Sequence, residues 1–209
     1  MRVVQFSPPR TGSTLVWQVL NRLPNVEARK EHEWKEEFAE YPVIATMRDP
    51  RDMCASMWRF ERNLGLEQII AGRTMNREEI LLSFGYAQTV ARQYGHHWTD
   101  PHILWLRYEL FWNEPAYLFT AIGDHLNVHL TPVERARISA LTSIAANKAR
   151  SSEFAGHEDY DLRTHIHGCH IMTGEPGSWR LCVPERMHDL YSDGVLAAFT
   201  DWDTEWEDA

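Results

Sequence analysis

Arg2-Val3-Val4-Gln5-Phe6-Ser7-Pro8-Pro9-Arg10-Thr11-Gly12-Ser13-Thr14 is the stretch that decides the fold. Its first five residues form a short apolar-rich run that predicts a strand, and the Pro pair ends that strand. Apolar residues at helical spacing follow over 13–23, so residues 7–14 join a strand to a helix. Backbone N–H groups at a helix N-terminus attract anions. The stretch therefore predicts an anion-binding turn.

The rest of the chain repeats this alternation of short apolar strands and longer helices. Strands are expected at 43–47 and 102–106, and residues 150–178 read as a long loop rich in Gly. Helices are expected at 51–63, 77–94, 114–126, 132–141 and from about 184. This order is typical of an α/β fold with a parallel sheet flanked by helices. We expect a single domain over residues 1–209.

Composition excludes several classes of function. The chain has 209 residues with a formal net charge of −9, which disfavours nucleic acid as a bulk partner. Its longest stretch without Asp, Glu, Lys or Arg is residues 80–91, whereas a membrane span needs about 20 residues. The apolar run at the N-terminus is too short for a signal peptide. Three cysteines without CxxC spacing favour reduced thiols, and we expect a cytoplasmic protein.

The turn at 7–14 carries the groups that an anion needs. Gly12 permits close approach, Arg10 adds a cation, and Thr11, Ser13 and Thr14 add hydroxyl donors. The turn differs from a Walker A loop because Ser13 stands where that motif has Lys, so the magnesium-binding logic of that motif is not supported. The alternative is a plain strand-to-helix turn with a Ser N-cap.

A second candidate follows the strand at 43–47. Arg48 ends that strand, where a guanidinium can bind a phosphate with two hydrogen bonds, and Ser56 lies eight residues further on. In parallel α/β sheets, ligands bind at the carboxyl ends of the strands. The alternative is a surface ion-pair cluster of Arg48, Asp49, Arg51 and Asp52.

Together these segments resemble the sulfotransferases that use 3′-phosphoadenosine 5′-phosphosulfate (PAPS). Residues 9–14 resemble the 5′-phosphosulfate loop of that family, and residues 48–56 resemble its 3′-phosphate motif. Leu106-Arg107-Tyr108-Glu109, residues 142–148 and Gly174-Glu175-Pro176-Gly177-Ser178-Trp179-Arg180 resemble three further segments, in family order.

The resemblance implies a P-loop NTPase-like topology and in-line sulfuryl transfer from PAPS to a hydroxyl or amine, with adenosine 3′,5′-bisphosphate (PAP) as product and no metal. It implies that Arg10 lies near the leaving 5′-phosphate and that Thr11, Gly12, Ser13 and Thr14 wrap this phosphate. The remaining implied donor contacts are Arg48 and Ser56 with the 3′-phosphate, Tyr108 and Thr142 with adenosine, and Gly174 in the closing loop.

The family's base, usually His, lies between the two phosphate motifs. His32, in Lys30-Glu31-His32, is the sole His in that interval, and a His can take the acceptor proton. Lys30 would add positive charge near the sulfuryl oxygens. The alternative is that the charge-dense segment 27–40 is a solvated helix, with Glu31 and Glu33 as fallback bases.

One departure from the family and one cluster of histidines have no assigned role. Met172-Thr173 stand where the closing loop usually has a basic pair, and Arg150, Arg163 or His170 are the candidates to compensate. A metal could in principle be bound by His165, His167 and His170 with Cys169. We favour surface exposure, or a lining role for one of these histidines, over metal binding.

Two other functions are weighed against transfer of a sulfuryl group. One is a nucleoside or metabolite kinase, and the other is a non-catalytic module that binds adenosine bisphosphate.

Overall fold

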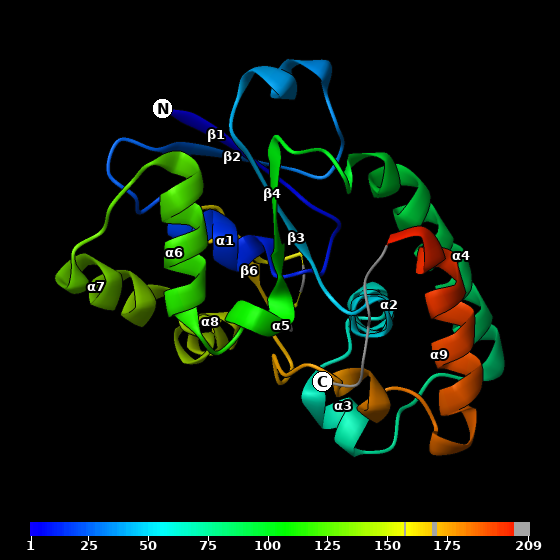
Figure 1. Ribbon diagram of the computed structural model, residues 1–209. Coiled ribbons are helices and arrows are strands. Elements are labelled where there is room, and N and C mark those ends of the chain that lie inside the picture. Colours follow the sequence, from blue (N-terminus) through cyan, green and yellow to red (C-terminus); the bar gives the residue numbers. More distant parts are fainter. Residues whose placement is uncertain (157, 169–170, 203–209) are drawn as a thin grey trace.

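A four-stranded parallel sheet lies at the centre of the molecule (Figure 1), with strand order β2-β1-β3-β4. The strands are β1 (Arg2–Phe6), β2 (Glu27–Glu31), β3 (Val43–Met47) and β4 (Ile103–Arg107). The computed structural model describes residues 1–156, 158–168 and 171–202. All five residues of β3 are buried, as the apolar run predicts for a strand covered on both faces. The predicted α/β class with a parallel sheet is confirmed.

Strand β2 corrects one expectation. The alternative reading of residues 27–40 as a solvated helix is wrong, because β2 pairs with β1 along its whole length, from Arg2 opposite Glu27 to Phe6 opposite Glu31. The rest of that segment holds only a short 3₁₀ helix, η1 (Glu36–Glu40). β2 is an edge strand whose charged side chains stay partly exposed to solvent. Its charged composition therefore does not prevent its backbone from pairing with β1.

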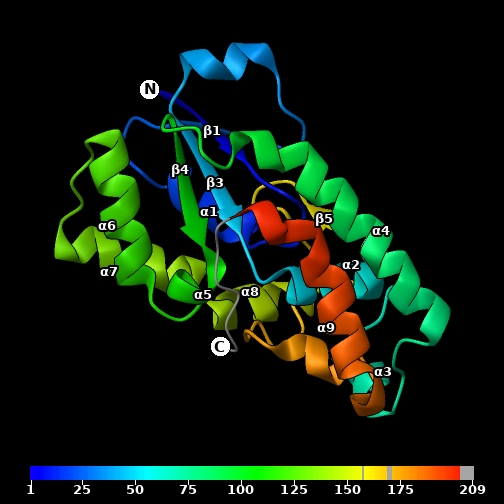
Figure 2. The same cartoon turned by 45° about the vertical axis from the view of Figure 1, so that its right-hand side comes forward.

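Helices cover both faces of the sheet. In Figures 1 and 2, α1, α6 and α7 lie on one side, and α2, α4 and α9 lie on the other. Each face has its own buried apolar cluster, one including Val16 and Ile122 and the other including Trp58 and Val195. The helices are α1 (Ser13–Leu20), α2 (Pro50–Glu61), α3 (Leu66–Ile70), α4 (Arg77–Tyr94), α5 (Tyr108–Phe111), α6 (Pro115–Leu126), α7 (Pro132–Thr142), α8 (Ile144–Ser151) and α9 (His188–Leu196).

The region expected to be a long loop is partly ordered. A two-stranded antiparallel hairpin forms within it from β5 (Tyr160–Asp161) and β6 (Ile166–His167). The remaining short helices are η2 (Gly95–His97), η3 (Ser178–Leu181), η4 (Glu185–Met187) and η5 (Ala197–Trp202). Among the described residues, no helix has the length and hydrophobicity that crossing a bilayer requires.

The parallel arrangement decides where a ligand can bind. Strands β1, β3 and β4 are neighbours that run in one direction, so the turns after them emerge at one edge of the sheet. Those turns begin at Ser7, Arg48 and Tyr108. The candidate residues of the sequence analysis therefore meet at the carboxyl ends of the strands.

Candidate anion-binding active site

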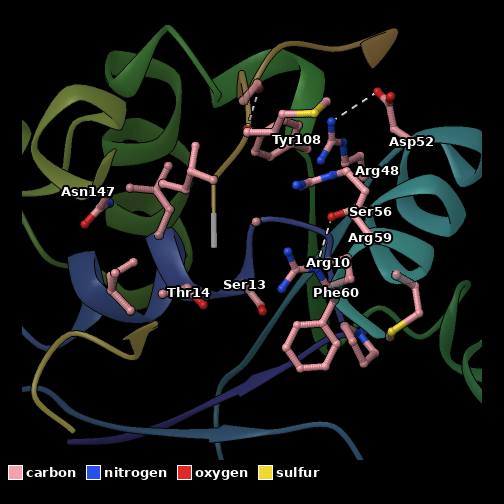
Figure 3. A pocket seen from close by; sticks show the side chains of 18 of the residues that line it. Arg10, Ser13, Thr14, Arg48, Asp52, Ser56, Arg59, Phe60, Tyr108 and Asn147 are labelled. Carbon is pink, nitrogen blue, oxygen red and sulfur yellow. Dashed lines mark hydrogen bonds and ion pairs between the residues drawn. The ribbon is translucent and has the colours of Figure 1, made fainter. Parts of the chain in front are cut away.

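A cavity of about 590 Å³ opens at this edge of the sheet (Figure 3). It brings together all but one of the predicted site residues, although they come from segments far apart in the sequence. The predicted residues that line it are Arg10, Gly12, Ser13, Thr14, Lys30, His32, Arg48, Ser56, Tyr108, Thr142 and Gly174.

Thr11 is the exception. Its side chain is fully buried beneath the turn instead of lining the cavity. The hydroxyl donates to the Pro8 carbonyl at 2.7 Å and lies 2.7 Å from Oγ1 of Thr46 on β3. The expectation that the Thr11 hydroxyl is a donor to the ligand is therefore corrected, because these contacts hold the turn against the sheet.

Gly12 directly precedes helix α1 and has a conformation that favours glycine, with φ of 86°. A Cβ atom at this position would lie 2.5 Å from Cδ2 of Tyr108, which packs against the turn. As the N-cap, Gly12 offers no side chain to the first N–H groups of α1, so the alternative of a Ser N-cap is wrong. Ser13 and Thr14 in this first turn line the cavity, and N–H groups at a helix N-terminus attract anions.

Arg10 connects the turn to helix α2. Its Nε donates to Oγ of Ser56 at 3.0 Å, and its guanidinium carbon lies 5.1 Å from the centre of the Phe60 ring. Burial and the nearby charges of Arg59 and Arg48 lower the pKa of Arg10 to about 9, which leaves it protonated at neutral pH. Arg10 is therefore a partly buried cation in the same cavity as Arg48 and Arg59.

Arg48 is buried at the start of the second motif. Its Nη2 lies 3.2 Å from Oδ2 of Asp52, and its guanidinium carbon lies 4.6 Å from the centre of the Tyr108 ring. Arg51 and Asp49 form a second pair at 2.7 Å. The alternative of a surface ion-pair cluster is wrong, because these four residues are all buried.

Asp52 binds the backbone of the closing loop, residues 174–180. This carboxylate accepts hydrogen bonds from the backbone N–H groups of Gly177 and Trp179, each at 2.8 Å. The Tyr108 hydroxyl donates to the Gly174 carbonyl at 2.6 Å, where Gly174 has a φ of 82°. Two segments that resemble parts of a nucleotide site thus contact each other directly.

His32 follows directly after β2 and reaches the cavity. Its Nδ1 lies 2.7 Å from the Ser7 carbonyl oxygen, so this nitrogen donates and Nε2 is the nitrogen that can accept a proton. Burial lowers the pKa of His32, which favours the neutral ring. The hydroxyl of Tyr94 donates to the His32 carbonyl and holds the backbone there.

Lys30 points from β2 to the first turn of α1. Its Nζ donates to Oγ1 of Thr14 at 2.9 Å. Burial and the charge of Arg10 lower the pKa of Lys30 to about 8. Lys30 is therefore charged at neutral pH but loses its proton more readily than an exposed lysine.

Thr142, the last residue of α7, lines the cavity. It is buried, and its hydroxyl donates to the Ile138 carbonyl at 2.8 Å. Its own carbonyl accepts a hydrogen bond from Nδ2 of Asn147 at 3.1 Å. Ile144, the first residue of α8, also lines the cavity.

Sequence reasoning missed several lining residues. Arg59 and Phe60 follow Ser56 by one helical turn, and that i to i+3 spacing is the signal that could have identified Arg59. The β5–β6 hairpin adds further side chains whose position depends on tertiary contacts. These are Tyr160, His165, Ile166 and His167.

The histidines of this region and the two candidate arginines differ in their position relative to the cavity. His165 and His167 line the cavity, whereas Cys169 and His170 lie outside the described residues. Among the described residues, no group of three or more His, Cys, Asp or Glu side chains is arranged to hold a metal ion. Arg163 is exposed, and Arg150 donates to the Leu141 carbonyl at 2.9 Å; neither lines the cavity.

Comparisons with known proteins find a matching family and similarly folded structures. The model of the sulfotransferase domain family matches residues 40–202. The mouse sulfotransferase SULT7A1 complexed with PAP is similar in structure, with a TM-score of 0.70, 15% identity, and coverage of 95% of this chain and 84% of that one. Retinol dehydratase with androsterone and the inactive cofactor PAP has a TM-score of 0.70 and 14% identity, over 100% of this chain and 83% of that one. No curated protein sequence matches this chain.

Proposed function

This chain belongs to the sulfotransferase family, and we propose that it moves a sulfuryl group from PAPS to a hydroxyl or amine of an acceptor. In this reaction a bond forms between the acceptor oxygen or nitrogen and sulfur. The bond between sulfur and the bridging oxygen of the phosphosulfate breaks, and PAP leaves. The acceptor loses one proton, which the enzyme must take up.

One observation carries this proposal: two basic turns, at the ends of β1 and β3, face one cavity. Arg10 comes from the first turn and Arg48 from the second. A ligand with two separated anionic groups is the natural match for two such turns, because each group offsets the charge of one turn. The complexes of PAP with similarly folded proteins support the choice of this nucleotide.

For the donor, the 5′-phosphosulfate would lie at the N-terminus of α1, against the N–H groups and hydroxyls of Ser13 and Thr14. Gly12 would allow the phosphate to approach the backbone closely. The 3′-phosphate would bind Arg48 and Ser56 on α2. Adenosine would then lie between Tyr108, whose hydroxyl is bonded to Gly174, and the wall that contains Thr142.

His32 is the proposed general base. The hydrogen bond from Nδ1 to the Ser7 carbonyl puts the proton of the neutral ring on Nδ1 and a lone pair on Nε2. Because burial also lowers the pKa of His32, the ring is neutral and ready to take the acceptor proton at physiological pH. Transfer to Nε2 as the new bond forms would complete the proton balance.

Lys30 and Arg10 would stabilise the transferring group. Both are cations in the cavity, and Lys30 is held beside Thr14 by a hydrogen bond of 2.9 Å. Charge on the sulfuryl oxygens and on the leaving oxygen changes during an in-line transfer, and fixed cations stabilise it without reorganisation. Catalysis on this account consists mainly of positioning and electrostatic stabilisation.

The test is sulfuryl transfer from radiolabelled PAPS to a broad panel of hydroxyl and amine acceptors. The wild-type protein is expected to label at least one acceptor class and to release PAP. His32→Gln is expected to bind PAP as the wild type does and to lose roughly 10²- to 10⁴-fold in turnover, the usual contribution of a general base. Full turnover in His32→Gln would remove the base assignment, and no transfer by the wild type to any acceptor would contradict the proposed reaction.

A further inference from the structure

The closing loop lacks basic side chains where the resemblance to sulfotransferases implies them. Met172 is buried, lines the cavity and is uncharged. The Thr173 hydroxyl accepts a hydrogen bond from the Glu175 N–H at 3.1 Å, so it serves the loop itself. A dianionic phosphate on this side of the cavity would therefore need a cation from another element.

Helix α2 carries such a cation at Arg59. This residue lies one turn after Ser56, so the two side chains share a face of the helix. Arg59 is 5% exposed and lines the cavity, and its Nη1 donates to the Leu64 carbonyl at 3.1 Å. In Figure 3, Arg59 lies beside Ser56 on the wall that also carries Arg48.

Arg59 and Arg48 act electrostatically on the same two residues that line the cavity, Arg10 and Cys182. Both lower the pKa of Arg10, and both oppose the burial that raises the pKa of the Cys182 thiol to about 11. Cys182 follows the closing loop and lines the cavity as well. Arg59 therefore shares one cavity with Arg10 of the first turn and with Cys182.

The balance of charge on the cavity wall is strongly positive. Four cations line it, Arg10, Lys30, Arg48 and Arg59, and among the described lining residues Asp52 is the one carboxylate. Asp52 is already shared between Arg48 and the N–H groups of the closing loop. Buried like charges destabilise one another, so this arrangement favours a multiply charged anion.

We propose that Arg59 is a specificity-determining residue that binds the 3′-phosphate of the donor from helix α2, in place of the basic pair that Met172-Thr173 lack. This inference rests on the proposed function, because it takes PAPS as the donor. Its consequence is selective: Arg59 contributes to binding nucleotides with a 3′-phosphate and contributes little to those with a 5′-phosphate alone.

Calorimetric titration with PAP and with adenosine 5′-monophosphate tests this assignment. Arg59→Gln is expected to weaken PAP binding roughly 10- to 100-fold, the scale of a lost charged hydrogen bond, and to change binding of the monophosphate less than about threefold. Arg163→Gln is the matched control, since Arg163 is exposed and outside the cavity. This control is expected to leave both affinities unchanged.

The outcomes separate the inference from the proposed function. Equal weakening of both nucleotides by Arg59→Gln, or no weakening of PAP, would overturn the role of Arg59. If Arg59→Gln fails to fold, Arg59→Met keeps the apolar stem of the side chain and is held to the same criterion. A wild-type protein that binds PAP no better than the monophosphate would instead contradict PAPS as the donor.

Discussion

Arg10 donates a hydrogen bond from Nε to Oγ of Ser56 at 3.0 Å, across 46 residues of sequence. The bond joins the turn after β1 to the helix after β3, so the two proposed phosphate sites are in contact before a nucleotide binds. A ligand that bridges both sites must compete with this bond or add to it. The two residues are therefore expected to act on nucleotide binding as a unit.

The first prediction concerns that coupling. Arg10→Ala and Ser56→Ala are each expected to weaken PAP binding, by roughly 1–3 kcal/mol for a hydrogen bond to a charged group. Because the side chains are in contact, the double variant should differ from the sum of the single changes by about 0.5–3 kcal/mol. Calorimetric titration of the wild type, both single variants and the double variant measures this term. Strictly additive losses would show that the two residues bind independently.

The second prediction compares two buried ion pairs at the start of α2. Arg48→Ala breaks the contact with Asp52 and Arg51→Ala breaks the contact with Asp49, so each is expected to lower the melting temperature. Of these two arginines, Arg48 lines the cavity and Arg51 does not. PAP should therefore raise the melting temperature of Arg51→Ala by more than that of Arg48→Ala. Equal stabilisation of both variants by PAP would remove Arg48 from the binding site.

The third prediction tests the glycine of the first turn. In Gly12→Ala, a residue with a Cβ atom must adopt a left-handed conformation, and that Cβ atom clashes with Tyr108. The free energy of unfolding should fall by at least about 1–2 kcal/mol. Gly85→Ala on α4 is the control, since its Cβ meets nothing within 4 Å. Removing a helical glycine there should stabilise the protein by about 0.5–1 kcal/mol. Denaturant unfolding measures both, and a neutral Gly12→Ala would contradict the turn geometry.

The fourth prediction is a bell-shaped dependence of kcat/KM on pH. His32 acts without its proton, and burial lowers its pKa, so activity should rise with pH through a midpoint below 6.5. Lys30 acts with its proton, so activity should fall as pH rises through about 8, where Lys30 titrates in the free enzyme. Lys30→Arg should move the descending limb to higher pH. An unmoved descending limb in that variant would assign the limb to another group.

Much of the fold follows from apolar patterning alone. The runs at 43–47 and 77–94 predicted β3 and α4 with the bounds that the structure has. Strand β2 was missed because Glu-Ala-Arg-Lys-Glu has no apolar period, and its pairing with β1 is a long-range effect. That residues 1–209 form one domain stays a prediction.

The site was predictable to the extent that parallel strands bring their carboxyl ends together. Arg10 and Arg48 could be assigned to one cavity on that rule. The inward orientation of the Thr11 side chain could not be predicted, because it depends on contact with the Thr46 hydroxyl on the neighbouring strand β3. Arg59 was missed because its relevance depends on which face of α2 meets the cavity.

Calorimetric titration of the wild-type protein with PAP, and separately with ATP and Mg²⁺, tests the central claim most directly. The account predicts saturable 1:1 binding of PAP and at most weak binding of ATP with Mg²⁺. Tight binding of ATP with Mg²⁺ and none of PAP would contradict it and favour a kinase.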